Sequence, residues 1–288
     1  MSSLQKTTVL VTGGANGIGK LMGEESLKRG ASKLIIWDIN EDNLEKTTEE
    51  LSDKGYDVYP YFVDVSDLED INFAANDVLQ RIGIPDILIN NAGIVVGKQF
   101  HEHSTRDIDK TIQINVLGVM HTTRAFLPDM IARGSGHLVN IASASSYLAN
   151  PNMSVYAASK WAVMGWSETV RLELEAINKN LRVTTIAPSY INTGMFDGVT
   201  APLMTPILEP AYIVGKIMSA IEKNQILVIE PPIAKTLPLL KGALPTRAFD
   251  YLAKNVFKVY NSMDHFQGRV KEEAVPEKKI QNTKHTPK

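Results

Sequence analysis

The chain has 288 residues, of which 44% are hydrophobic and 22% are charged, a composition typical of a globular protein with a large core rather than of a disordered chain. Its formal charge of -2 excludes an overall basic field of the kind that would hold nucleic acid or an anionic bilayer, so we expect a small-molecule partner and no nucleic acid. Cysteine is absent, which excludes disulfides, thiolate nucleophiles and cysteine-based zinc sites.

Short, β-branched, apolar runs recur along the chain, separated by longer stretches with helical periodicity. Strands that alternate with helices predict an α/β fold, in which helices cover both faces of a doubly wound, seven-stranded parallel sheet. We expect a single domain over residues 1–267, because no linker or internal repeat interrupts the pattern. The strands are expected at residues 7–12, 34–38, 58–63, 87–89, 138–141, 183–187 and 226–229.

A glycine-rich loop, residues 12–19 (TGGANGIG), lies between the first predicted strand and a helix that ends at Gly30. Glycines at such a turn let the backbone approach a pyrophosphate, which would lie against the unpaired N–H groups of the helix. Ordinary strand-to-helix turns also need glycine. The loop alone therefore leaves a nucleotide site and a purely structural turn equally open.

Asp38, at the end of the second predicted strand, favours the nucleotide site. It follows Gly19 by nineteen residues, about where a carboxylate would accept hydrogen bonds from an adenosine ribose. The structural alternative is a helix N-cap, for which Asn40 is equally well placed. Neither Ile39 nor the neutral glycine-rich loop offers a cation to a 2′-phosphate, so we predict NAD rather than NADP.

A phenol, an ammonium group and a hydroxyl form the candidate catalytic set. Tyr156 and Lys160 are four residues apart on a helix predicted over residues 154–178, so they share one face. Ser143 lies at the C-terminal end of a predicted strand, where ligands bind in open α/β sheets. Tyr212 and Lys216 repeat the spacing without an upstream serine, so we interpret them as an ordinary helix pair.

The order and spacing of these motifs resemble those of the short-chain dehydrogenase/reductase family over nearly the whole chain. Residues 12–19 match the cofactor loop TGxxxGxG and residues 90–93 match NNAG, while Asn115, Ser143, Tyr156 and Lys160 match the catalytic tetrad. One departure is Ser189, because the family usually has glycine after the proline at this position. The resemblance implies a Rossmann fold and cofactor contacts at Gly13, Asn16, Gly17, Ile18, Gly19, Asp38, Asp64, Val65, Asn91, Ala92, Gly93, Tyr156, Lys160, Pro188 and Thr193.

The resemblance also implies a reaction, the interconversion of an alcohol and its carbonyl by hydride transfer with NAD. Ser143 would bind the substrate oxygen, Tyr156 would act as acid or base, and Asn115 would anchor a water that relays the proton from Lys160. Because a free phenol has a pKa of about 10, we expect Lys160 and oxidised nicotinamide to lower the pKa of Tyr156. A structural hydrogen bond is the alternative role of Asn115.

Residues 188–210 are expected to form a mobile lid over the substrate. The charged residues between positions 184 and 215 are Asp197 and Glu209, with no lysine or arginine, whereas a carboxylate, phosphate or coenzyme A thioester would usually meet a cation. We therefore expect a lipophilic alcohol or ketone. The alternative is that these apolar side chains only pack the lid down. They are Met195, Phe196, Val199, Leu203, Met204, Ile207 and Leu208.

The C-terminal part of the chain is expected to add an amphipathic helix over residues 246–262 and a polar, disordered tail over residues 268–288. Docking on the core is the default for this helix, with a subunit contact or a membrane surface as alternatives. The extension resembles the branch that contains retinol and 17β-hydroxysteroid dehydrogenases. No apolar run reaches the roughly 18 residues of a membrane span, so we expect a cytoplasmic protein with at most peripheral membrane contact.

Two other functions stay open at this point. A reductase of 3-oxoacyl groups on a carrier would predict basic residues near the mouth of the pocket. A non-catalytic dinucleotide-binding module would commonly lack Tyr156 or Lys160, and both are present. We expect no metal, since His101 and His103 have no convergent third ligand, and we expect a homodimer or homotetramer.

Overall fold

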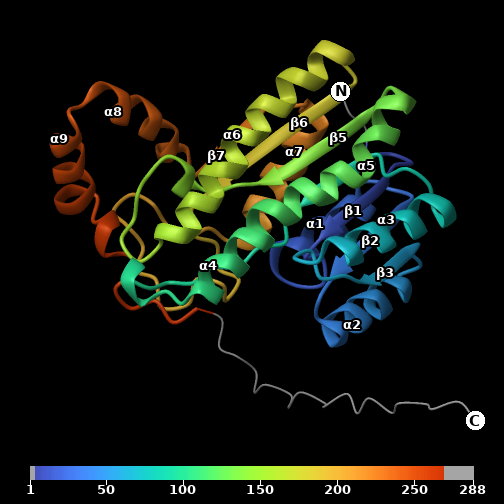
Figure 1. The fold of residues 1–288 in the computed structure, drawn as a ribbon, viewed down its shortest axis with the longest axis horizontal. Helices are drawn as coiled ribbons and strands as arrows, with labels where there is room; N and C mark the ends of the chain where they lie inside the picture. The colour runs from blue at the N-terminus through green and yellow to red at the C-terminus, as the bar shows by residue number, and fades with distance from the viewer. Residues whose placement is uncertain (1–3, 269–288) are drawn as a thin grey trace, which may run out of the picture.

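The computed structural model describes residues 4–268, and its centre is one sheet of seven strands in the order β3-β2-β1-β4-β5-β6-β7 (Figure 1). All neighbouring strands pair in parallel. The predicted fold class is therefore confirmed, because each strand falls on one of the seven apolar runs. The strands are β1 (Thr8–Thr12), β2 (Lys33–Asp38), β3 (Val58–Phe62), β4 (Ile87–Asn90), β5 (Gly136–Ile141), β6 (Leu181–Pro188) and β7 (Leu227–Glu230).

Helices cover both faces of the sheet, and each face has its own hydrophobic core. Met22, Leu44 and Ile217 pack on one face, whereas Ile71 and Phe126 pack on the other. The helices on the first face are α1 (Gly17–Lys28), α2 (Glu41–Ser52) and α7 (Pro210–Lys223). The helices on the second face are α3 (Leu68–Arg81), α5 (Val119–Arg133) and α6 (Ser154–Ile177). The short α4 (Thr105–Ile112) lies beside α6. Continuous burial explains why the strands are apolar on both sides.

The ends of two strands differ from the prediction. Gly136 pairs with Leu181 at the start of β5 and β6, two residues before the apolar runs begin. Backbone pairing, and not side-chain polarity, sets where a strand begins. The sequence pattern therefore located these strands correctly and made them too short.

Residues 231–268 form a C-terminal arm that extends from β7 and lies at the left of Figure 1. The prediction of one helix over residues 246–262 is wrong. The helix ends because Lys258 adopts a left-handed backbone with φ of 56°, and because the Phe257 carbonyl accepts a hydrogen bond from the Leu203 N–H at 2.8 Å. The arm contains α8 (Leu237–Ala243), α9 (Thr246–Tyr251), a π-helical turn (Leu252–Val256) and a 3-10 turn (Val259–Asn261).

The segment between β6 and α7, residues 189–209, is joined to the end of the arm by backbone hydrogen bonds. The Thr200 N–H donates to the Ser262 carbonyl at 2.9 Å, and the Asp197 carbonyl accepts from the N–H groups of Gln267 and Gly268 at 2.9 and 3.2 Å. Gly268 is thus buried and fixed, so the expected tail does not begin there. Residues 269–288 lie outside the described residues.

Within residues 4–268, no helix combines the length and the hydrophobicity that crossing a bilayer requires.

Candidate active site

A cavity of about 470 Å³ lies along the carboxyl ends of the strands, where open parallel sheets bind their ligands. It runs from the glycine-rich loop to the arm. Asn115 is not part of its wall, but every other site residue expected from the sequence is. These are Gly13, Asn16, Gly17, Ile18, Gly19, Asp38, Asp64, Val65, Asn91, Ala92, Gly93, Ser143, Tyr156, Lys160, Pro188 and Thr193.

The glycine-rich loop presents backbone rather than side chains to this cavity. A Cβ on Gly19 would lie 2.0 Å from the Gly13 carbonyl oxygen, and one on Gly13 would lie 3.0 Å from the Cα of Ala92. The Asn91 amide donates to the carbonyls of Thr12 and Gly13, each at 3.0 Å, and so holds the loop against β4. This bare backbone before the first turn of α1 fits a pyrophosphate.

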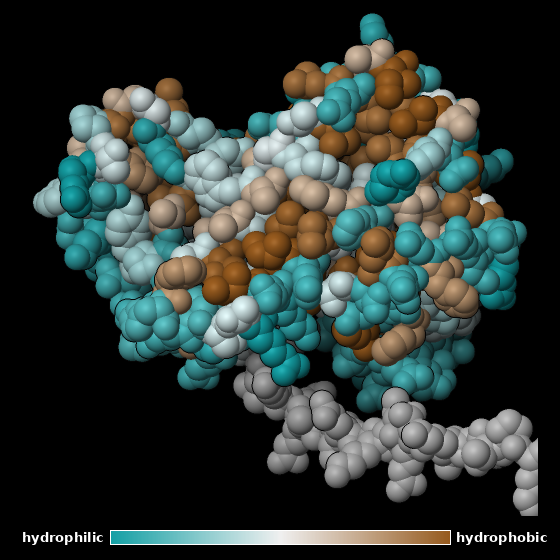
Figure 2. Space-filling model, viewed as in Figure 1, coloured by the Kyte–Doolittle hydropathy of each residue, from teal (hydrophilic) through white to brown (hydrophobic). Residues whose placement is uncertain are grey.

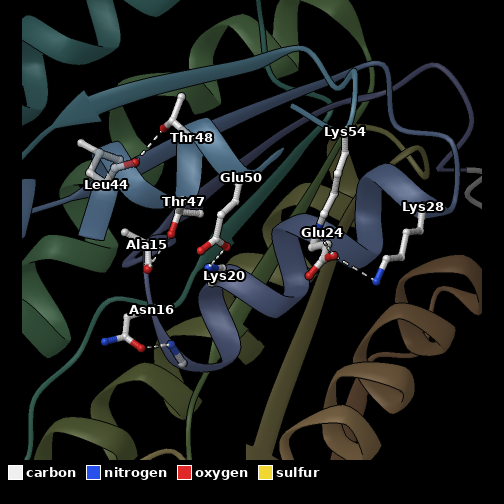
Figure 3. Close-up of polar contacts among 11 residues, drawn as sticks. Ala15, Asn16, Lys20, Glu24, Lys28, Leu44, Thr47, Thr48, Glu50 and Lys54 are labelled. Atoms are coloured by element: carbon white, nitrogen blue, oxygen red, sulfur yellow. Dashed lines mark hydrogen bonds and ion pairs between the residues drawn. The ribbon is translucent and has the colours of Figure 1, made fainter. Parts of the chain in front are cut away.

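The loop is also held from α2, a contact that the sequence analysis missed (Figure 3). The Thr47 hydroxyl donates to the Ala15 carbonyl at 3.0 Å. Asn16, next to it, is the N-cap of α1, and its side chain accepts from the Gly17 N–H. Lys20 of α1 pairs with Glu50 of α2. Only tertiary packing brings α2 to the loop, so no local motif could have indicated these contacts.

Asp38 lines the cavity and also fixes its surroundings. One carboxylate oxygen accepts from the Ala15 N–H at 2.9 Å and the other from the Asn40 N–H at 3.0 Å. Asn40 is the N-cap of α2, so the alternative role of Asp38 as that cap is wrong. Lys110 is a cation in the cavity wall that the sequence analysis overlooked.

The turn after β3 is shaped by carboxylates. Asp64 accepts from the N–H and hydroxyl of Ser66 at 2.8 and 2.6 Å, while its own N–H donates to Asp70 at 2.8 Å. A Cβ on Gly118 would lie 2.7 Å from the Val65 carbonyl oxygen. Asp64 and Val65 are thereby fixed at the cavity wall, next to the polypeptide that carries Asn115.

Ser143, Tyr156 and Lys160 converge where β5 ends and α6 begins. Tyr156 and Lys160 are buried on one face of α6. The Lys160 Nζ donates to the Ile141 carbonyl at 2.8 Å and lies 5.8 Å from the centre of the Tyr156 ring. The Ser143 hydroxyl makes hydrogen bonds with Ser145 and with Tyr156. The structure thus brings the predicted set together.

Burial dominates the electrostatics of this set. Burial raises the pKa of Tyr156 to about 12, although the hydrogen bond with Ser143 acts in the opposite direction. Burial also lowers the pKa of Lys160 to about 8. The lowering of the Tyr156 pKa by Lys160 together with oxidised nicotinamide stays a prediction, because it concerns the protein with its cofactor bound.

Asn115 lies behind the wall, in a π-helical turn (Gln113–Gly118) between α4 and α5. Its side-chain oxygen accepts from the Ile94 N–H, and its amide donates to the Ile94 carbonyl and to the Ser159 hydroxyl, at 2.9 to 3.1 Å. Both N–H groups of the amide are therefore occupied. A Cβ on Gly93 would lie 3.3 Å from the Asn115 oxygen and 3.6 Å from the Lys160 nitrogen, so glycine keeps the space between them open.

Tyr212 and Lys216, the pair with the same spacing, lie elsewhere. The Tyr212 hydroxyl donates to Glu230 at 2.9 Å, the Lys216 nitrogen lies 5.3 Å from the centre of its ring, and neither residue belongs to the cavity wall. Their interpretation as an ordinary helix pair agrees with this position.

The other end of the cavity is apolar. Phe196 meets Tyr156 edge-on, with 6.1 Å between ring centroids, and Tyr190 at 5.1 Å. The lid contributes less than expected, because Leu203 and Met204 are 52% and 64% exposed and do not line the cavity. The apolar residues of this end include Leu148, Met153, Met195, Phe196, Pro202, Ile233, Ala234, Leu237, Leu240, Phe249, Leu252, Ala253, Phe257 and Val259.

A buried polar cluster joins this end to the arm. The Asn150 amide donates to the Tyr190 and Ser262 hydroxyls at 2.8 and 2.9 Å, and those two hydroxyls are 2.8 Å apart. The three residues come from distant parts of the sequence, so no local pattern could reveal the cluster. Among the residues that the structure describes, no group of three or more histidine, cysteine or carboxylate side chains is placed to hold a metal.

Comparison with known proteins identifies the family. A family model described as short chain dehydrogenase matches residues 7–203. The chain belongs to the short-chain dehydrogenase family. Estradiol 17-beta-dehydrogenase 11 from Homo sapiens is 36% identical to it over 249 residues, which are 86% of this chain and 82% of that protein. Epidermal retinol dehydrogenase 2 from Homo sapiens is 36% identical over 262 residues, 90% of this chain and 84% of that protein.

Solved structures of family members have the same fold. A short-chain dehydrogenase/reductase from Burkholderia phymatum in complex with NAD superposes with a TM-score of 0.77 at 26% identity, covering 84% of this chain and 95% of that one. A short-chain dehydrogenase from Burkholderia cenocepacia in complex with NADP has a TM-score of 0.74 at 25% identity, and the match covers 88% of this chain and 100% of that one. The resemblance to this dehydrogenase family and its hydroxysteroid and retinol branch is thus confirmed.

Proposed function

We propose that this short-chain dehydrogenase interconverts an alcohol and its carbonyl on a lipophilic substrate, with NAD as cofactor. The observation that carries the proposal is that Ser143, Tyr156 and Lys160 meet where the polar end of one cavity passes into its apolar end. The human relatives named for estradiol and retinol support the substrate class. NAD, bound along the glycine-rich loop, would supply the hydride acceptor and a positive charge beside the phenol.

Ser143, Tyr156 and Lys160 would have different roles in the reaction. The Ser143 hydroxyl would bind the substrate oxygen, and the Tyr156 hydroxyl would give or take its proton. With its pKa raised by burial, Tyr156 is held as a proton donor until positive charge arrives. Lys160 would bring part of that charge. Because the Asn115 amide is occupied, a relay water would have to use the backbone of this residue rather than its N–H groups.

Cofactor choice rests on Asp38. Its carboxylate lies in the cavity wall at the end of β2, and two backbone N–H groups fix its position. A 2′-phosphate placed there would meet a fixed negative charge, whereas a ribose diol would find an acceptor. Family members bind NAD in one solved structure and NADP in another, so the preference of this chain depends on its own residues.

A second candidate is the reduction of carrier-linked 3-oxoacyl groups. Basic side chains are exposed on the arm, other residues of which line the apolar end of the cavity: these are Lys235, Arg247, Lys254 and Lys258. Against it, among residues 4–268 the cations of the cavity wall are only Lys110 and Lys160, and Lys160 is already placed beside Tyr156.

We also propose that the protein is a homodimer or homotetramer. Leu172 and Ile177 are each 58% exposed on α6, and Figure 2 shows hydrophobic residues gathered over the end of this helix. An apolar patch of this kind is typical of a subunit contact. Sedimentation equilibrium would test it, since a monomer at micromolar concentration would refute the proposal. Cytoplasmic residence stays a prediction.

The enzymatic proposal is tested by initial rates with a panel of steroids, retinoids, long-chain alcohols and carrier-linked 3-oxoacyl substrates, each with NAD and with NADP. We expect turnover of uncharged lipophilic alcohols with NAD. Turnover confined to carrier-linked substrates would favour the second candidate, and no turnover of any substrate would favour a non-catalytic binding module.

A further inference from the structure

One hydroxyl group interrupts the apolar face of α2. The buried residues of this helix are Leu44, Thr47 and Leu51, which are spaced so that they share the face toward the core. Thr47 is only 1% exposed. A hydroxyl buried at such a position destabilises the fold unless it has a hydrogen-bond partner, and valine has nearly the same shape without that cost. A threonine at position 47 therefore indicates a role beyond packing.

The partner of this hydroxyl belongs to the glycine-rich loop and not to α2 (Figure 3). The Thr47 hydroxyl donates to the Ala15 carbonyl at 3.0 Å. The next residue, Thr48, makes the ordinary contact of a helical threonine, because its hydroxyl donates to the Leu44 carbonyl one turn earlier, at 2.7 Å. Of these two neighbouring threonines, Thr47 alone reaches the loop.

Ala15 is held on both sides of its backbone. Its N–H donates to Asp38 at 2.9 Å, and its carbonyl accepts from Thr47. Asp38 also accepts from the N–H of Asn40, the residue that caps α2. Hydrogen bonds thus close a ring that runs from the loop through the end of β2 and α2 back to the loop. The ring fixes the loop relative to Asp38 and Asn40, which line the cavity.

The carbonyl that Thr47 holds belongs to the same peptide group as the Asn16 N–H. This peptide is trans, so the two bonds point in opposite directions and the Asn16 N–H points away from Thr47. The N–H groups of residues 13–15 donate to the end of β2. Within residues 4–268, the N–H groups of Asn16, Ile18 and Gly19 have no acceptor, and all three residues line the cavity.

We propose that Thr47 is a positioning residue for the phosphates of the cofactor: by holding the Ala15 carbonyl, it turns the Asn16 N–H toward a pyrophosphate oxygen in the cavity. This inference rests on the proposed function, because it takes NAD to be the ligand. Neither Thr47 nor Ala15 lines the cavity, so Thr47 acts through the loop and does not touch the cofactor. A donor that is fixed in advance need not be ordered when the anion binds, which strengthens binding.

Other contacts keep α2 in place without this hydroxyl. The two leucines of its buried face belong to the hydrophobic core. Lys20 of α1 pairs with Glu50 of α2, and Glu24 of α1 pairs with Lys54 just beyond the end of α2 (Figure 3). Removal of the Thr47 hydroxyl should therefore release the loop and leave the protein folded.

Binding of ligands with and without phosphates tests the proposal, by their displacement of NADH as followed by its fluorescence. The probes are ADP, which has a pyrophosphate, and adenosine, which has none. We expect Thr47→Val to weaken ADP about fivefold and adenosine less than about twofold, because one hydrogen bond contributes an effect of this size and adenosine does not reach the loop. Thr47→Ala, which also lacks the hydroxyl, should give the same pattern.

Two further variants serve as controls. Thr48→Val removes the neighbouring hydroxyl that stays within α2, and should bind both probes as the wild type does. Thr47→Ser keeps the hydroxyl and should restore the affinity for ADP. In steady-state kinetics, Thr47→Val should raise the KM for NAD about fivefold at an unchanged kcat, since the loop binds the cofactor and does not take part in hydride transfer.

Equal affinity of Thr47→Val and Thr48→Val for ADP would overturn the positioning role, even if the enzyme oxidises lipophilic alcohols. A loss for adenosine as large as that for ADP would also overturn it, because it would show a general disturbance of the nucleotide site. A protein whose affinity for ADP depends on Thr47 but which turns over no alcohol would leave the positioning role intact and refute the proposed function instead.

Discussion

Gly198 lies directly against the backbone of His265, so that a Cβ added to Gly198 would be 2.0 Å from the His265 carbonyl oxygen. Gly198 also has a φ of 83°, a conformation that other residues rarely adopt. The β6–α7 segment and the arm therefore meet so closely that only glycine fits. Because Phe196, two residues earlier, touches Tyr156, this junction fixes one wall of the candidate active site.

Replacing Gly198 by alanine should therefore separate the segment from the arm. We expect a loss of roughly 2 kcal/mol or more in the free energy of unfolding, from left-handed strain together with the clash. We also expect kcat/KM for long-chain alcohols to fall further than for short ones. The control is Gly215→Ala in α7, where a Cβ meets open space and a helix favours alanine by up to about 1 kcal/mol. Equal stability of the two variants would contradict the tight junction.

Asp38→Asn should shift cofactor preference while keeping the loop in place. Asparagine retains one acceptor oxygen for the Ala15 or Asn40 N–H and removes the negative charge that would repel a 2′-phosphate. We expect the ratio of kcat/KM with NADP to that with NAD to rise about tenfold or more. Asp42→Asn, on the first turn of α2, should leave the ratio unchanged. A wild-type enzyme that already prefers NADP would refute the claim that the Asp38 carboxylate disfavours a 2′-phosphate.

His137 should make stability depend on pH. It is buried in β5, its Nε2 lies 2.8 Å from the Thr184 hydroxyl, and burial lowers its pKa to about 4 from an ordinary value of 6.5. The unfolded chain therefore binds the proton more readily, so this contribution to stability is complete above pH 6.5 and is lost as the pH falls toward 4. The loss should be roughly 3 kcal/mol.

The measurement is denaturant unfolding between pH 7 and pH 4. His137→Gln, which cannot titrate, should flatten the profile over this range, whereas the exposed His101→Gln should not. An identical slope in the wild type and His137→Gln would show that other groups cause the acid sensitivity.

Two neighbouring leucines of α8 test the lipophilic pocket. Leu240 lines the cavity and Leu239 is 73% exposed. In the wild type, kcat/KM should rise about fourfold for each CH₂ of the substrate while the pocket has room, because each buried CH₂ contributes about 0.8 kcal/mol. Leu240→Arg should flatten this rise by placing a charge where an alkyl chain would lie, and Leu239→Arg should not. A wild-type kcat/KM that is independent of chain length would refute the lipophilic pocket.

The parts of the molecule that were predicted correctly are those encoded by neighbouring residues. The buried strands are continuous apolar runs. The spacing of Ser143, Tyr156 and Lys160 led us to expect them together, as they are at the cavity, whereas their catalytic roles stay predictions. The broken C-terminal helix was not predictable, because the Phe257 carbonyl turns to Leu203, more than fifty residues earlier. The burial that raises the pKa of Tyr156 could not be predicted for a similar reason, since it depends on the assembled cavity and not on the spacing to Lys160.

The central claim is that Tyr156 exchanges the proton of the reacting oxygen, and the pair of variants Tyr156→Phe and Tyr212→Phe tests it most directly. Both substitutions delete one hydroxyl from a tyrosine that is followed four residues later by a lysine, but only Tyr156 lines the cavity. The measurement is the rate of NAD reduction with a lipophilic alcohol, together with NAD binding by calorimetry. We expect Tyr156→Phe to lose about three orders of magnitude or more in kcat while still binding NAD, and Tyr212→Phe to keep wild-type turnover. Equal losses in the two variants, or full activity in Tyr156→Phe, would contradict the account.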